Sequence, residues 1–232
     1  MRRRTVLAVP AALAALAASA CTSDDPAATP SASPQEVLAQ VHDVLVAGGG
    51  LTIALSSSAV PTNVNGVTAA AGQGVVDPDE PKFKGTVTGT IRGVAGTINV
   101  ITIGDSAWMK LFTPDYAPVS LTDLGAPNPS DLFDPKTGIA HLVVATRDPQ
   151  AGKPRRQGKE ILKTYTGTLP GEPVRTLLNL GAGTGDFQVE YGVADGHQLR
   201  ATTITGAFYP GATSTYTLTL TDFGSTVAIS AP

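Results

Sequence analysis

The first periodic stretch of the chain has a helical pattern. Apolar residues recur every three or four positions, at Val37, Leu38, Val41, Val44 and Leu45. The segment 33–36 has the form of a capping box, with Ser33 at the N-cap, Pro34 at the first helical position and Glu36 at the third. We therefore predict a helix that begins at Pro34 and ends before the three glycines at 48–50.

Alternation with a period of two predicts strands at 51–55, 83–92 and 187–193. The clearest is 83–92, where Phe83, Gly85, Val87, Gly89 and Ile91 share one face. The glycines on this apolar face supply no bulk, so the face has room for something else, or the glycines mark a bend in a curled sheet. These two interpretations are compatible.

The rest of the chain adds further strands and two short helices. We expect strands at 98–103 (with a bulge near 100–101), 161–167, 199–204, 216–220 and 227–229, a long loop at 121–134, helices beginning at 134–135 and 172–173, and a hairpin turn at 195–196. Strands outnumber helices, and the connections have hairpin length. The predicted fold class is α+β, with a curled, mostly antiparallel sheet packed on a few helices.

Composition narrows the class of protein further. The formal net charge of −3 gives no reason to expect nucleic-acid binding. Aromatic residues are only 5% of the 232 residues, so the interior must be built from small and branched side chains. One cysteine excludes an internal disulfide.

The N-terminus has the three parts of a secretory signal. Arginines at 2–4 precede an apolar run at 6–16, and small residues at 18–20 lead to Cys21. The apolar run is too short to span a bilayer. We predict a lipoprotein signal peptide at 1–20, with Cys21 lipidated and the protein anchored at the extracytoplasmic face of the cell membrane. The alternative is an ordinary secretory signal cut near Ala20, which leaves a free thiol.

The segment after the cysteine has no periodic apolar pattern. Residues 22–34 are rich in Ser, Thr, Pro, Ala and Asp, so we expect a disordered tether over 21–34 with an r.m.s. reach of roughly 20 Å. The folded domain is then predicted at 35–232.

Catalytic motifs are weak. The three histidines, at 42, 141 and 197, are far apart in sequence without metal-ligand spacing, and a nucleophile elbow is absent from the sequence. The glycine-rich 181–185 precedes a strand, whereas a dinucleotide loop follows a strand and opens a helix. We predict a protein that is not an enzyme and has no cofactor or metal.

A basic run at 153–159 has two interpretations. It contains Lys153, Arg155, Arg156 and Lys159. It is either a solvated loop or a contact for anionic lipid headgroups, to which each charge near a membrane contributes about 1 kcal/mol.

Several motifs in succession carry a resemblance to a known family. They are 104–111 (GDSAWMKL), 132–140 (LFDPKTGIA), 158–160 (GKE), 165–170 (YTGTLP), 195–199 (DGHQL) and 218–224 (LTLTDFG). Their order and spacing, with the lipidation signal, resemble the LppX/LprAFG lipoproteins of mycobacteria and related actinobacteria over residues 35–232. The resemblance implies a half-barrel of antiparallel strands around helices, with a large apolar cavity that binds multi-acylated lipid or glycolipid for transport through the envelope.

The energetics of acyl chains make such a cavity useful. Exposing a chain of about 15 methylenes to water costs roughly 12 kcal/mol, and an apolar cavity removes that exposure. The candidate lining residues are Val41, Leu45, Ile53, Leu55, Phe83, Val87 and Ile91; each of them could equally belong to a packed core.

A second hypothesis belongs to another class of function. The chain would be a surface-anchored interaction module that scaffolds an envelope transporter, without lipid cargo and with a packed interior. In both hypotheses we expect a monomer.

Overall fold

One antiparallel sheet dominates the computed structural model, which describes residues 32–62, 64–91, 93–110, 114–179 and 185–232. Residues Ala32–Pro232 form one compact unit, which contains all the described helices and strands. The strands are β1 (Gly49–Ser58), β2 (Gly66–Val76), β3 (Lys82–Ile91), β4 (Val94–Ile103), β5 (Ser106–Lys110), β6 (Ala117–Val119), β7 (Arg147–Ala151), β8 (Arg155–Gln157), β9 (Glu160–Leu169), β10 (Phe187–Val193), β11 (Leu199–Tyr209) and β12 (Ala212–Ser225).

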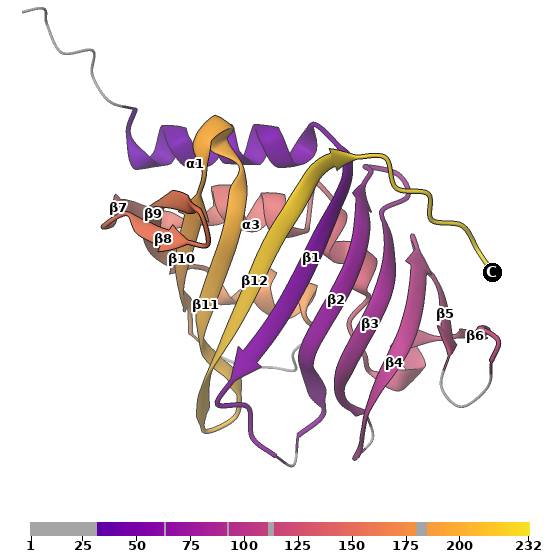
Figure 1. Ribbon diagram of the computed structural model, residues 1–232. Coiled ribbons are helices and arrows are strands. Elements are labelled where there is room, and N and C mark those ends of the chain that lie inside the picture. Colours follow the sequence, from indigo (N-terminus) through magenta and orange to yellow (C-terminus); the bar gives the residue numbers. More distant parts are fainter. Residues whose placement is uncertain (1–31, 63, 92, 111–113, 180–184) are drawn as a thin grey trace, which may run out of the picture. The chain divides into compact units, whose positions relative to one another are not determined.

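The sheet has 12 strands and open edges. Its order is β6-β5-β4-β3-β2-β1-β12-β11-β10-β9-β7, and β8 pairs with β9 off this path (Figure 1). All described strand pairs are antiparallel. The last long strand, β12, lies between β1 and β11 and so joins the early and late halves of the chain. This architecture confirms the α+β prediction of a curled antiparallel half-barrel with a few helices.

The first helix, α1 (Pro34–Val46), begins as the sequence predicts. The Glu36 backbone N–H donates to Ser33 Oγ at 3.3 Å, and the Ser33 backbone N–H donates to Glu36 Oε2 at 2.7 Å, which completes the capping box. At the other end Gly48 and Gly49 take φ values of +85° and +96°, a region that favours glycine, so the chain can turn from the helix into β1.

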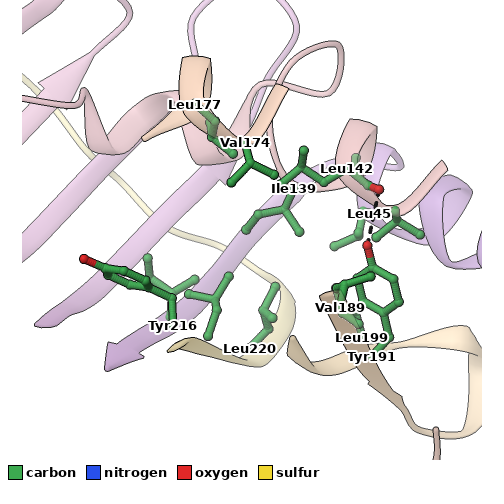
Figure 2. Packing of buried hydrophobic residues seen from close by; sticks show 14 of the residues in the cluster. Leu45, Ile139, Leu142, Val174, Leu177, Val189, Tyr191, Leu199, Tyr216 and Leu220 are labelled. Carbon is green, nitrogen blue, oxygen red and sulfur yellow. Dashed lines mark hydrogen bonds between the residues drawn. The ribbon is translucent and has the colours of Figure 1, made fainter. Parts of the chain in front are cut away.

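The inner face of the sheet is the face that the helices cover. The remaining helical segments are α2 (Leu121–Leu124), the 3₁₀ segment η1 (Pro129–Phe133), α3 (Ile139–Ala145), α4 (Gly171–Leu177) and the 3₁₀ segment η2 (Asp195–His197). In Figure 2, side chains of α3 and α4 such as Leu142 and Val174 point toward those of the sheet, such as Val189 and Leu220. Burial of both sets forms the core.

A buried hydrogen-bond cluster fixes α3 to the sheet. The hydroxyl of Tyr191, on β10, donates to the Leu142 carbonyl at 3.2 Å (Figure 2). It also lies 2.8 Å from Thr146 Oγ1. Burial raises the pKa of Tyr191, so the hydroxyl stays protonated and available as a donor.

Aromatic rings occupy the space that the glycines of β2 and β3 leave. A Cβ on Gly72 would lie 2.9 Å from Phe83 Cε2, one on Gly85 would lie 2.7 Å from Phe83 Cζ, and one on Gly74 would overlap the Phe133 ring. The two rings stack with centroids 6.1 Å apart and an interplanar angle of 16°. Room on the glycine face therefore exists, and in this structure Phe83 and Phe133 fill it.

Three sequence expectations about these elements were wrong. The pairing of β4 with both neighbours shows no register shift, so the expected bulge at 100–101 is absent from these ladders. Ile101 is buried on the outer face instead, opposite Trp108, where the C-terminal Pro232 also lies. Asp134 accepts from the backbone N–H of Lys136 in a turn, so α3 begins later, at Ile139.

The third error concerns the C-terminus. Residues 227–229 are not a strand; the segment packs across β1, where Val227 lies so close to Gly50 that a Cβ there would overlap it.

Several further elements were not predicted. The loop expected at 121–134 contains α2 and η1. Strand β2 has mostly Ala and Gly where an alternating strand would have large apolar residues, so it lacks the usual signal.

We predict that Gly74→Ala destabilises the fold by about 2 kcal/mol, because the added methyl group must displace the Phe133 ring. Gly96→Ala is the matched control, since a Cβ there meets nothing within 4 Å and alanine restricts the unfolded chain. Urea denaturation of both variants measures the difference. Equal stability of the two would contradict the packing described here.

Candidate functional site

A continuous apolar row crosses the inner face of the sheet. The row takes one residue from each of five neighbouring strands, and the strand register places each residue directly opposite the next. Its members are Leu218 of β12, Leu55 of β1, Ala70 of β2, Val87 of β3 and Ile98 of β4. Residues opposite one another in paired strands point to the same face, so these five side chains form one surface. We call it the inner row.

The helices cover this face unevenly. One step closer to α1, the large side chains of the next row, Leu220, Ile53 and Val100, are buried. In the inner row Leu218 is buried, whereas the other four members are only partly buried. The sheet therefore carries an apolar surface beyond the part that the helices cover.

The structure divides the seven predicted lining residues into two groups. Val41 and Leu45 of α1, with Ile53 and Phe83 of the sheet, are buried in the core cluster. Three are partly exposed: Leu55 and Val87 in the inner row, and Ile91 at the end of β3.

The pocket between helices and sheet is small in this structure. Its volume is about 10 Å³, and it is lined by Leu45, Leu51, Val76, Leu132, Phe133, Asp134, Pro135, Ile139, Ala140 and Leu220. That volume holds about one water molecule. It is apolar and lies between the expected layers, but it is far smaller than the cavity that the family resemblance implies.

A tyrosine pair borders the inner row on the side away from α1. The hydroxyls of Tyr209 and Tyr216 are 2.6 Å apart, and Tyr216 donates to the Val67 carbonyl at 2.7 Å. This bond links β12 to β2 across β1. Burial raises the pKa of Tyr216, which keeps the hydroxyl protonated at physiological pH.

The segment η1 closes the pocket with its Phe133 ring. It is held by polar contacts to the β4–β5 turn: Asn128 Nδ2 donates to the Gly104 carbonyl at 2.9 Å, and Ser130 Oγ donates to the same oxygen at 3.2 Å. Burial, together with the carboxylates of Asp105 and Asp134, raises the pKa of Asp131.

Three of the predicted headgroup contacts, Arg155, Arg156 and Lys159, lie on the hairpin made by β8 and β9, and Lys153 precedes it. Lys153, Arg156 and Lys159 are exposed. Arg155 points to the other face of β8, where its Nε lies 3.6 Å from Glu190 Oε1. The structure therefore separates Arg155 from the other three cations.

The described residues show little that could support catalysis. Within that part of the chain, His, Cys, Asp and Glu form no group of three or more that could hold a metal. His42 Nδ1 lies 3.2 Å from Asp43 Oδ1 on the surface of α1, and His141 lies in α3. No helix among the described residues is both long and apolar enough to cross a membrane. Cys21 and the predicted signal peptide lie outside the described residues.

Sequence reasoning missed part of the inner row. Ala70 lies in the strand without an alternating pattern, and Ile98 and Leu218 were placed in strands without being assigned to the lining. Leu55 and Val87 were already candidates for the lining, and the cross-strand register identifies the residues beside them. That register can be assigned only when the order of the strands in the sheet is known.

These features define the class of protein first: an open antiparallel half-barrel with helices over one face of the sheet. The LppX_LprAFG lipoprotein family model matches residues 33–229, so the chain belongs to that family. In sequence, no curated protein matches the chain.

Two solved structures show the same fold at low identity. LprF from Mycobacterium bovis has a TM-score of 0.74 and 14% identity, and the match covers 88% of this chain and 98% of LprF. The lipoprotein LppX from Mycobacterium tuberculosis has a TM-score of 0.62 and 20% identity, over 85% of this chain and 98% of LppX.

We predict that Asp131→Asn raises the melting temperature at pH 7. A raised pKa of Asp131 means that its ionised form is less favourable in the folded chain than in the unfolded chain. Ionised Asp131 therefore lowers the free energy of unfolding at any pH above its pKa in the folded chain. This loss of stability disappears as pH falls below its pKa in the unfolded chain, about 4. The gap between variant and wild type should therefore shrink on acidification.

Thermal melts between neutral pH and pH of about 4 measure this gap. Asp79→Asn, at an exposed aspartate in the β2–β3 turn, is the control and should leave the melting temperature unchanged. A lower melting temperature for Asp131→Asn at pH 7 would contradict the electrostatic account of η1.

Proposed function

We propose that this chain is a membrane-anchored lipoprotein that binds a multi-acylated lipid or glycolipid against the inner row and assists its transfer through the cell envelope. The observation that carries the proposal is the half-covered apolar surface formed by Leu55, Ala70, Val87 and Ile98. Membership of a lipoprotein family supports it.

The inner row has the chemistry that acyl chains require. Its members are all apolar, and a chain of about 15 methylenes that leaves water gains roughly 12 kcal/mol. Binding in this mode needs no bond chemistry, because transfer from bilayer to an apolar protein surface is close to neutral in free energy.

Lipid entry requires the inner face to open further. Pockets for ligands of ordinary size measure roughly 300–1,000 Å³, whereas the pocket here measures about 10 Å³. The segment that would move is η1, whose Phe133 ring lies over Gly74. Its side-chain hydrogen bonds to the sheet are those of Asn128 and Ser130 to the Gly104 carbonyl. Its displacement would extend the inner row toward Ile53.

The proposed anchor limits how far the carrier can travel. A diacylated Cys21 at the extracytoplasmic face, with a tether of about 20 Å reach, would hold the domain at one membrane. The proposed role is therefore extraction of lipid and hand-off to a partner, such as an envelope transporter, and not free diffusion. Lipid carriage by a shed form would contradict this part.

The competing function is an anchored interaction module without cargo. The nearly filled pocket is what a packed interior would show. Lipid uptake separates the two functions, since the module has no place for an acyl chain.

We predict that Val87→Trp reduces uptake of a pyrene-labelled diacyl phospholipid at least tenfold, because the indole would cover the inner row. The measurement is pyrene fluorescence on titration of residues 32–232, with circular dichroism to check the fold. Position 87 is partly exposed, so the larger side chain has space to be accommodated.

Thr86→Trp is the matched control, because Thr86 immediately precedes Val87 on β3 and its side chain points to the opposite face of the sheet. It should bind as wild type does. Wild-type uptake that survives Val87→Trp in a folded variant would rule out the inner row as the site, and no uptake by wild type would favour the interaction module.

A further inference from the structure

The β8–β9 hairpin carries an exposed isoleucine among cations. Among the described residues the exposed large apolar side chains are Val94, at 70%, and Ile161, at 56%. Val94 begins β4, and the residue opposite it in the ladder is the apolar Ile91. Ile161 differs, because Arg156 lies directly opposite it in the ladder.

The two faces of this hairpin have different environments. Arg155 and Leu162 pair on the packed face, where Leu162 is fully buried. Arg156 and Ile161 pair on the open face, and Lys163 follows two residues after Ile161, so it points the same way and is exposed. Lys159 lies at the turn, next to Gly158 with a φ of +57°.

Two acidic residues beside the hairpin, Glu160 and Glu190, already have partners. Glu160 receives two hydrogen bonds from Arg200, at 3.1 and 3.2 Å, and Glu190 lies 3.6 Å from Arg155. The cations of the open face therefore keep a local positive charge, although the whole chain has a net charge of −3.

The hairpin lies at the end of the sheet that is nearest the start of α1. The C-terminal end of α1 is fixed near β2, since Leu45 and Val76 line the same pocket. The N-terminal end of α1 extends toward β7, which contacts α1 and pairs with β9 (Figure 1). Cys21 precedes the first residue of α1 by 13 positions, a length of chain with a reach of roughly 20 Å.

We propose that the open face of the β8–β9 hairpin docks on an anionic lipid bilayer, with Ile161 inserted at the interface and Arg156, Lys159 and Lys163 on lipid phosphates. An apolar side chain ringed by basic ones is the pattern of interfacial membrane contacts. Docking here would orient the domain on the membrane. The proposal is independent of lipid carriage, because the hairpin is separate from the inner row.

The test is sedimentation of residues 32–232 with vesicles, which omits the predicted signal and anchor. Wild type should bind vesicles of mixed phosphatidylglycerol and phosphatidylcholine and should not bind pure phosphatidylcholine. The double variant Arg156→Gln/Lys159→Gln should bind roughly 25-fold more weakly, at about fivefold per charge. Ile161→Ser should weaken binding about fivefold.

Two matched controls locate the effect on the hairpin. Lys84→Gln/Lys136→Gln removes two exposed lysines elsewhere, and Val94→Ser removes the second large apolar side chain that is exposed among the described residues; both variants should bind as wild type does. The proposal is overturned if wild type does not prefer anionic vesicles, or if the control variants weaken binding as much as the hairpin variants do. Since every substituted residue is exposed, all variants should fold.

Discussion

The structure depends on one constraint: a wide apolar sheet face must be covered, and the described part of the chain has only short helices with which to cover it. α1 is the longest at 13 residues, while α3 and α4 have 7 each. Near α1 the core is complete, with Leu38, Val41 and Ile53 fully buried. Farther along the strands the coverage ends, and the inner row is left partly exposed. The candidate site is a consequence of this incomplete covering.

Glycine and phenylalanine solve the packing problem at the boundary between the two regions. Gly72, Gly74 and Gly85 bring the backbones of β2 and β3 beneath the rings of Phe83 and Phe133. The Phe133 ring lines the pocket, and it belongs to η1, which lies outside the sheet and is attached by polar contacts to Gly104. The sheet supplies a rigid apolar wall, and the segment that fills the space beside it is attached only locally.

Local patterns predicted much of this fold. The capping box of α1 and the alternation in β3 and β10 are signals within a few residues, and these elements were placed correctly. β2 was missed because Ala and Gly carry no alternating bulk, and its strand identity comes from pairing with both neighbours. The bulge at 100–101 was wrongly predicted because Ile101 is buried on the outer face of the sheet, opposite Trp108 of the next strand.

The site was predictable only in part, for a related reason. Leu55 and Val87 could be named from the pattern within a single strand. That they belong to one continuous row follows only from the strand order and from Ala70, which lies between them. Single-strand patterns also cannot distinguish core from lining, so Phe83 and Ile53 were grouped with Leu55. Whether a residue belongs to the core or to the lining depends on which end of its strand the helices cover.

Native mass spectrometry of residues 32–232, expressed in a mycobacterial host, tests the central claim most directly. A lipid-binding inner face predicts mass adducts that organic extraction identifies as acylated lipids, bound by wild type and lost in Val87→Trp. A clean apo mass that stays unchanged after incubation with envelope lipid extract would contradict the account, and would favour an anchored module with a packed interior.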